Sequence, residues 1–212
     1  MDTPKKIASY LLQSKAIKLE PSTPFTWALG WKSPIYCDNR KTLSYPEIRD
    51  FIRDSFVETI TNTYPGVEVI AGVATAAIAH AVLVADKLKL PFVYVRSEPK
   101  SHGLENLIEG VIEPGQKVVV IEDLISTGGS SIKAVRALSE SGCKVLGMLA
   151  VFSYGFPLAE KNFIDADCKF NSLSNYNSLI DLALETGYIT EIQAKILGEW
   201  RLDPENWRPL KS

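Results

Sequence analysis

Residues 118–131 read VVVIEDLISTGGSS, and this stretch decides the fold. The dense apolar run that ends in Glu122 and Asp123 predicts a buried strand over 117–123. The Gly- and Ser-rich residues after it open a helix predicted over 129–141. In open α/β sheets, ligands bind beyond the carboxyl ends of the strands. The loop between this strand and this helix is therefore the first place to look for a site.

The surrounding sequence repeats the alternation of strands and helices. Apolar runs predict further strands at 67–73, 92–96 and 144–152, and helical spacing predicts helices at 46–61 and 75–88. Strands that are apolar on both faces and separated by helices indicate a parallel sheet covered on both sides. We therefore expect a doubly wound, mostly parallel α/β fold.

Additional elements are expected at both ends of a single domain that covers residues 1–212. A helix is predicted over 3–14, with Thr3 as its cap and Pro4 at its first position. The stretch 21–36 is rich in proline and aromatic residues and is expected to be irregular. The tail from 175 to 212 is expected to form two helices and an irregular end.

Composition excludes several classes of protein. With 46% hydrophobic and 23% charged residues, the chain has the profile of a soluble globular protein. The formal net charge of −2, without a cationic block, argues against nucleic-acid binding. We expect no signal peptide and no membrane span. Cys37, Cys143 and Cys168 are widely spaced and form no zinc motif with His80 and His102, which favours reduced thiols in a cytoplasmic protein.

The loop after the acid pair has the composition of a phosphate cradle. Gly128 and Gly129 allow close approach to an anion, the helix start offers free N–H groups, and hydroxyls come from Ser126, Thr127, Ser130 and Ser131. The lysine of the P-loop motif is absent. Because ionised carboxylates accept hydrogen bonds, two adjacent acids suit a ligand with two vicinal hydroxyls. The acid pair and the phosphate cradle together suit a ribose 5-phosphate. The alternative is an exposed acidic turn before a Ser- and Gly-rich helix cap. Short Gly/Ser loops are common, but the full string of apolar residues, two acids and STGGSS is more specific than such a loop.

Two further segments have candidate roles. The loop 96–110 is polar and brings Arg96, Lys100 and His102 within seven residues, so it could neutralise an anionic leaving group, or it could be an ordinary exposed loop. The turn 72–76 joins a strand to a helix, and its N–H groups could bind a pyrophosphate, or it could be an ordinary turn. His80 lies in an apolar helix and is expected to be structural.

The string at 118–131 resembles the signature with which type I phosphoribosyltransferases bind phosphoribosyl pyrophosphate (PRPP). The Arg96, Lys100, His102 and Gly103 pattern resembles the catalytic loop of orotate phosphoribosyltransferases, and the FT, GWKSP and DNR segments within 25–40 resemble their N-terminal stretch. This resemblance implies transfer of phosphoribosyl from PRPP to orotate in pyrimidine (UMP) biosynthesis. It also implies Mg²⁺ held mainly by PRPP oxygens, a base-covering hood within 1–45, and a homodimer whose 97–110 loop acts in the neighbouring site.

The resemblance also assigns roles to individual residues. It implies that the catalytic residues are Lys100, His102 and Asp123. It implies that PRPP is bound by Arg96, Lys100, His102, Glu122, Asp123, Leu124, Ile125, Ser126, Thr127, Gly128, Gly129 and Ser130. For orotate, Ser126 is implied, and Lys32 and Arg40 are candidate substitutes for basic residues of the family that this chain replaces, among others, by Ala28, Ala76 and Ser97.

Two other functions are considered. A phosphoribosyltransferase for a purine base would share the 122–131 motif but not the loop around Lys100 or the Ser33-Pro34 segment. A PRPP-sensing regulator that binds nucleic acid would be expected to show an added binding module or a basic face. The near-neutral charge argues against the regulator.

Overall fold

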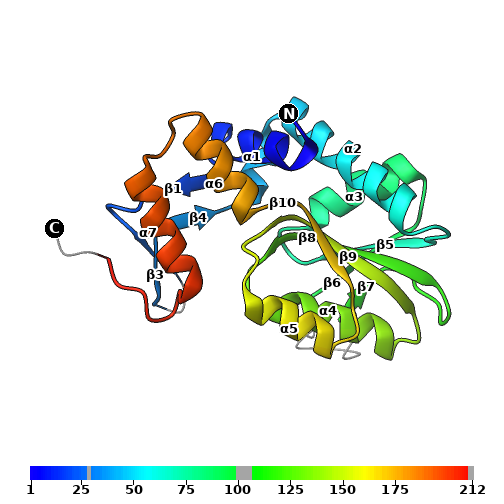
Figure 1. Ribbon diagram of the computed structural model, residues 1–212. Helices are drawn as coiled ribbons and strands as arrows, with labels where there is room; N and C mark the ends of the chain where they lie inside the picture. Colours follow the sequence, from blue (N-terminus) through cyan, green and yellow to red (C-terminus); the bar gives the residue numbers. More distant parts are fainter. Residues whose placement is uncertain (28–29, 99–106, 210–212) are drawn as a thin grey trace.

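The computed structural model describes residues 1–27, 30–98 and 107–209, and its centre is one six-stranded sheet (Figure 1). The strand order is β10 (Phe170–Asn175), β9 (Lys144–Ser153), β8 (Lys117–Ile125), β5 (Val69–Val73), β6 (Phe92–Val95) and β7 (Ile108–Glu109). All neighbours are parallel except β6 and β7. The prediction of a mostly parallel α/β sheet is confirmed.

Helices cover both faces of this sheet. Helices α2 (Pro46–Thr63) and α3 (Ile78–Leu88) lie on one face, and α4 (Gly129–Glu140) and α5 (Pro157–Asp165) lie on the other (Figure 1). Successive residues of a strand point to opposite faces of the sheet, so each strand contributes side chains to two hydrophobic cores. In β8, Val119 packs in the core that includes α2 and α3, whereas Val118 packs in the core that includes α4 and α5. Burial on both sides explains why the strands read as continuous apolar runs.

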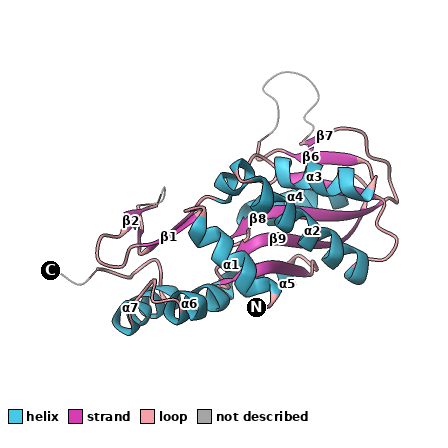
Figure 2. Cartoon of the chain, turned by 90° about the horizontal axis from the view of Figure 1, so that it is seen from above, coloured by secondary structure: helices cyan, strands magenta, loops and turns pink. Residues whose placement is uncertain are grey.

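The two ends of the chain form a second group of elements beside the sheet (Figures 1 and 2). Strand β1 (Ile17–Leu19) pairs with β4 (Ile35–Cys37), and β2 (Phe25–Thr26) pairs with β3 (Lys32–Ser33). We call these four strands the hood. Helices α6 (Tyr176–Glu185) and α7 (Glu191–Leu202) lie next to it, and Trp200 of α7 meets Trp27 at 5.7 Å between ring centroids.

Several boundaries differ from the predictions. The cap of α1 (Thr3–Gln13) is Asp2, whose carboxylate accepts a hydrogen bond from the Lys5 amide, and not Thr3. The segment 21–36, predicted to be irregular, contains β2 and β3 and the start of β4. Strand β8 continues to Ile125, so the acid pair lies inside the strand and not at its last residues. Within the described ranges, the structure has no helix that is both long and apolar enough to cross a membrane.

Candidate active site

The acid pair lies near the carboxyl end of β8, and its two members differ in their surroundings. Glu122 is 4% exposed, and its carboxylate accepts hydrogen bonds from the Ser131 hydroxyl at 2.9 Å and from the Asp123 amide at 3.0 Å. Burial, followed by the neighbouring Asp123 charge, holds the pKa of Glu122 well above its ordinary value. Burial also raises the pKa of Asp123, but its side chain is only partly buried. Asp123 is therefore the member that is open to a ligand.

The loop after β8 has the backbone of an anion cradle. Gly128 has φ +82° and a Cβ there would lie 3.0 Å from the Phe163 ring, so the position requires glycine. The first helical hydrogen bond of α4 runs from the Ile132 amide to the Gly128 oxygen. The amides of residues 129–131 precede that bond and are therefore available at the helix start. The loop is held from α5 by Asn162, whose amide donates to the Thr127 oxygen at 2.8 Å.

The hydroxyls of the loop divide between two tasks. Ser130 is exposed, and Ser126 and Thr127 are partly exposed, so these three hydroxyls can meet a ligand. Ser131 is 1% exposed and donates to Glu122 instead. The sequence assigned Ser131 to the phosphate, and the structure shows that its hydroxyl is used inside the protein.

A pocket of about 370 Å³ lies next to the acid pair and the loop. It is lined by Thr26, Trp27, Tyr36, Cys37, Leu124, Ser126 and Tyr154. Leu124 directly follows Asp123, and Ser126 is the first loop residue, so the pocket adjoins both parts of the cradle. Its aromatic walls come from the hood and from the residue after β9, which suits a flat ring. We call it the base pocket.

One buried amide links the hood to the acid strand. Asn39 is fully buried at the start of the 3-10 helix η1 (Asn39–Ser44), and its side chain donates to the Asp123 carbonyl oxygen at 2.6 Å. Its own oxygen accepts a bond from the Cys37 thiol at 3.3 Å. Desolvation raises the pKa of this thiol well above the ordinary value, so Cys37 lines the base pocket as a neutral group.

The two candidate cations of the N-terminal segment lie in different places. The Lys32 ammonium donates to the Thr26 hydroxyl at 2.7 Å, and Thr26 lines the base pocket. The Arg40 guanidinium is bonded to Asp38 at 2.6 Å, and its charge opposes in small part the rise that burial causes in the pKa of Asp123. Lys32 is thus placed beside the base pocket, and Arg40 is placed beside the acid pair.

Of the basic loop, the structure describes only the ends. Arg96 follows β6 at the same edge of the sheet as Asp123, and its guanidinium lies 3.5 Å from the Glu109 carboxylate. Lys100 and His102 lie outside the described residues, as do Ala28 and most of the 97–110 segment.

The turn after β5 has a packing role at Gly72. A Cβ on Gly72 would lie 2.9 Å from that of Ala81, so glycine lets α3 approach the strand. The Ala74 amide donates to Val95 and is not available to a ligand. His80 is 2% exposed, and burial lowers its pKa to about 4, so it is a neutral group inside α3.

Of the acid pair, only the partly exposed Asp123 carboxylate is open to act as a ligand of a metal ion. Carboxylate oxygens are ligands that Mg²⁺ prefers. Among residues 1–27, 30–98 and 107–209, there is no group of three or more His, Cys, Asp or Glu side chains that could hold a metal ion.

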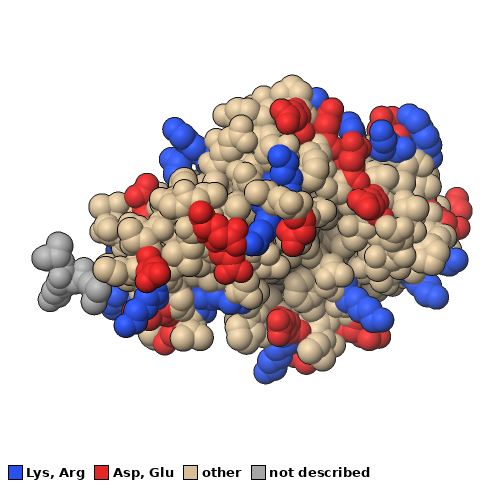
Figure 3. Space-filling model, turned by 45° about the horizontal axis from the view of Figure 1, so that its top comes forward, with Lys and Arg blue, Asp and Glu red and all other residues tan. Residues whose placement is uncertain are grey.

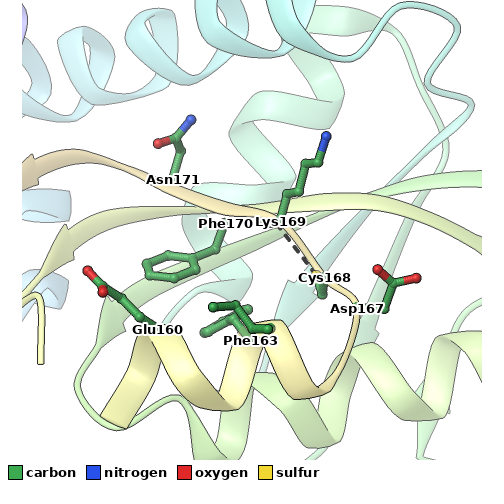
Figure 4. Close-up of a pocket in the computed structure, with 8 residues that line it drawn as sticks. Glu160, Phe163, Asp167, Cys168, Lys169, Phe170 and Asn171 are labelled. Carbon is green, nitrogen blue, oxygen red and sulfur yellow. Dashed lines mark hydrogen bonds between the residues drawn. The ribbon is translucent and has the colours of Figure 1, made fainter. Parts of the chain in front are cut away.

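Surface features away from the loop are less specific. On the face in Figure 3, acidic and basic side chains are interspersed. A hollow of about 550 Å³ lies between α5 and the edge strand β10, where Phe163 and Phe170 meet at 4.3 Å (Figure 4). None of its lining residues belongs to the acid pair, the loop or the base pocket.

Several residues of this site have no local sequence signal. Trp27, Tyr154 and Asn162 come from segments distant from the 118–131 string, and the chemistry of each residue alone indicates no role. Cys37 and Asn39 lie in the 25–40 segment, but their bond to each other and to the acid strand depends on the folded hood.

Comparisons with known proteins agree with this site. Residues 42–185 match the phosphoribosyl transferase domain family. The chain is 61% identical over 203 residues to an orotate phosphoribosyltransferase of Porphyromonas gingivalis, covering 96% of this chain and 97% of that protein. It is 59% identical over 200 residues to one of Bacteroides fragilis, covering 94% of each. The crystal structure of orotate phosphoribosyltransferase from Aeropyrum pernix matches with a TM-score of 0.74 at 25% identity, covering 87% of this chain and 99% of that chain. With its acid pair, anion cradle and adjoining base pocket, the chain belongs to the orotate phosphoribosyltransferase family.

Proposed function

We propose that this protein transfers the 5-phosphoribosyl group from PRPP to orotate, giving orotidine 5'-monophosphate and pyrophosphate in pyrimidine (UMP) biosynthesis. The observation that carries this proposal is the contact between the cradle and the base pocket, which share the segment from Leu124 to Ser126. A ribose phosphate held in the cradle would present its C1 carbon to a ring in the pocket. The high identity to proteins named orotate phosphoribosyltransferase supports orotate as that ring.

The cradle and the acid pair act on the phosphoribosyl group. The 5-phosphate binds the amides and hydroxyls of the 126–130 loop. Asp123 accepts hydrogen bonds from the ribose hydroxyls, and Glu122 lies buried behind it with Ser131. As pyrophosphate leaves, the sugar gains oxocarbenium character, and the negative charge of Asp123 stabilises it. Leu124 and Ile125 place the loop relative to this pair.

The base pocket holds orotate. Trp27, Tyr36 and Tyr154 offer aromatic surface for the flat ring, and Ser126 offers a hydroxyl for a ring oxygen or nitrogen. Orotate also carries a carboxylate, which needs a cation. Lys32 is the proposed partner because it is already bonded to Thr26 in the pocket wall. Arg40, closer to the acid pair, is the second candidate.

The leaving pyrophosphate needs neutralisation. Arg96 lies at the carboxyl edge of the parallel strands, as Asp123 does, and could neutralise the pyrophosphate there. The family pattern assigns Lys100 and His102 to this neutralisation as well. Mg²⁺ supplies further positive charge to the pyrophosphate oxygens when it is bound. We further propose a homodimer in the cytoplasm, in which the 97–110 loop of one subunit serves the site of the other. We propose no nucleic-acid or membrane partner.

The test is an assay of the purified protein with PRPP, Mg²⁺ and orotate, in which the reaction is monitored by the loss of orotate absorbance. Adenine, guanine and hypoxanthine are run in parallel. We expect magnesium-dependent turnover of orotate and none of the purines. Consumption of a purine in place of orotate would contradict the substrate assignment but keep the PRPP site. Tight PRPP binding without turnover of any base would contradict the enzymatic function.

A further inference from the structure

The C-terminal helix α7 reaches the turn after β9 through one side chain. The Arg201 guanidinium donates from Nε to the Tyr154 carbonyl oxygen at 3.0 Å and from Nη2 to the Gly155 carbonyl oxygen at 3.1 Å. Hydrogen bonds from a charged donor are stronger than neutral ones, and two from one rigid fork fix a direction as well as a distance. Arg201 thus holds the backbone of this turn at two successive carbonyls.

Arg201 is itself held by α6. Its Nη1 donates to the Asn177 side-chain oxygen at 2.8 Å, and its guanidinium lies 4.8 Å from the centre of the Tyr176 ring. The third donor group and one face of the guanidinium are therefore occupied by α6. The side chain therefore connects α6 and α7 to the turn after β9 through three hydrogen bonds.

The turn that Arg201 holds forms one wall of the base pocket. Tyr154 lines the pocket and is 1% exposed, and its ring packs against Trp27 at 5.5 Å and against Trp200 at 5.7 Å. Its amide donates to the Ile125 carbonyl oxygen at 3.1 Å, which ties the same turn to the phosphate loop. A displacement of the turn would move the Tyr154 ring and change the space left for a base.

Gly155 shows that the contact is close. Its φ of +64° is in the left-handed region, and a Cβ built there would lie 2.8 Å from Arg201 Nη2. A residue with a side chain would therefore push the guanidinium away from the carbonyls. The glycine and the arginine form a matched pair, although they are 46 positions apart.

We infer that Arg201 is a positioning residue for base binding: it holds the Tyr154–Gly155 turn, and through it the wall of the base pocket. This inference rests on the proposed function. Helix α7 lies beyond the 42–185 segment that matches the phosphoribosyl transferase domain family, so an element outside the shared domain takes part in recognising the base. Loss of Arg201 should weaken binding of the base and leave binding of the ribose phosphate unchanged. The hydrogen bonds of the Arg201 side chain go to Tyr154, Gly155 and Asn177, and none goes to the acid pair or to residues 126–131.

The variant that tests this is Arg201→Met, which keeps an unbranched side chain and removes all donors. Arg208→Met is the matched control, since Arg208 is exposed in the same terminal segment and bonds only to Glu205 and Trp207 oxygens there. We expect the KM for orotate to rise roughly tenfold or more, as for the loss of charge-assisted hydrogen bonds, while the KM for PRPP changes by less than about twofold. Calorimetry with two probes gives a readout without turnover. Orotidine 5'-monophosphate should bind more weakly, and ribose 5-phosphate should bind as to the wild type.

The conservative variant and the fold are checked together. Arg201→Lys can reach one carbonyl but not both, so it should recover part of the orotidine 5'-monophosphate affinity. If Arg201→Met does not fold by circular dichroism, Asn177→Ala is used instead. Asn177→Ala removes only the α6 partner of Arg201, so it should weaken the binding of orotidine 5'-monophosphate in the same direction but by a smaller factor.

The outcomes separate the inference from the proposed function. A folded Arg201→Met protein with wild-type affinity for orotidine 5'-monophosphate overturns the inference. Equal losses for orotidine 5'-monophosphate and ribose 5-phosphate also overturn it, since they indicate general damage. Failure of the wild-type protein to use orotate overturns the proposed function and the inference with it.

Discussion

The side chain of Asn39 donates a 2.6 Å hydrogen bond to the backbone carbonyl oxygen of Asp123, 84 positions further along the chain. Asn39 is fully buried, and its side-chain oxygen accepts a hydrogen bond from the thiol of Cys37, which lines the base pocket. One amide therefore connects the pocket for the base with the strand that holds the ribose. In the proposed mechanism, this amide would set the position of the base pocket relative to the ribose site.

Replacing Asn39 with alanine should lower both the stability and the activity of the protein. The variant leaves the buried Asp123 carbonyl without its donor, at a cost of about 1–3 kcal/mol, and allows the acid strand to shift relative to the hood. We expect kcat/KM for PRPP to fall roughly tenfold to hundredfold, since each 1.4 kcal/mol corresponds to about a factor of ten. Asn206→Ala is the control because Asn206 is exposed and bonds only to Asp203 through its side chain in this structure. Unchanged kcat/KM in a folded Asn39→Ala protein would remove the residue from the mechanism.

Glu122→Gln should stabilise the protein increasingly as the pH rises. Burial raises the pKa of Glu122 in the folded protein above its value of about 4.3 in an unfolded chain. The folded state therefore binds more protons than the unfolded state between these two values, and stability is lost as the pH rises through that window. Glutamine removes this loss. Melting temperatures of the variant and the wild type should thus diverge as the pH rises above about 4.3, the value in the unfolded chain, towards the raised pKa of Glu122 in the folded protein. Parallel curves would contradict a raised pKa of Glu122 in the folded protein.

The sheet could be read from the sequence because its signals are local. Strand β8 is an apolar run of valine and isoleucine, and the Gly-rich start of α4 follows directly, so 118–131 was informative on its own. Strand β10 was not predicted, because it lies at the edge of the sheet and reads FNSLSN, with few apolar residues. Helix α5 has only nine residues, too few for a clear helical period.

The site could be read only where it follows one stretch of chain. Asp123 and the loop were assigned from their order along the sequence. The partner of Ser131 was not, because a hydroxyl at the third position of α4 can face a ligand or the preceding strand, and only the buried Glu122 decides between them. The bond of Asn39 to Asp123 joins segments 84 positions apart, and the bonds of Arg201 to Tyr154 and Gly155 join segments 47 and 46 positions apart. Nothing in the residue types at either end indicates these bonds.

Lys32→Ala should weaken the binding of orotate selectively. Lys32 is exposed and bonded to Thr26 at the base pocket, so its ammonium can reach a carboxylate on the ring. We expect the KM for orotate to rise roughly tenfold, as for one lost charge-assisted hydrogen bond, and the KM for PRPP to stay near the wild-type value. Lys89→Ala is the control, because Lys89 is 80% exposed at the end of α3 and pairs with Asp86.

Arg40→Ala distinguishes the two candidate cations. Arg40 is bonded to Asp38, and its charge acts on the Asp123 carboxylate, so its loss should act on the PRPP side of the site. We expect the KM for PRPP to rise in this variant. An unchanged KM for orotate in Arg40→Ala would remove Arg40 from the orotate site, and an unchanged KM for orotate in Lys32→Ala would remove Lys32.

The basic loop can be tested by combining two inactive proteins. Lys100→Ala should lower kcat by roughly a hundredfold or more, as for the loss of one stabilising group of about 2.7–4 kcal/mol. Asp123→Asn should be similarly impaired, because it removes the charge beside the sugar. In a homodimer whose loops act in the neighbouring site, a mixed dimer has one site with both an intact Asp123 and an intact Lys100. The two variants, unfolded and refolded together, should therefore regain activity that neither shows alone. A mixture without activity, with mixed dimers confirmed by mass spectrometry, would place Lys100 in the site of its own subunit. Near wild-type kcat in Lys100→Ala would exclude the loop from the chemistry altogether.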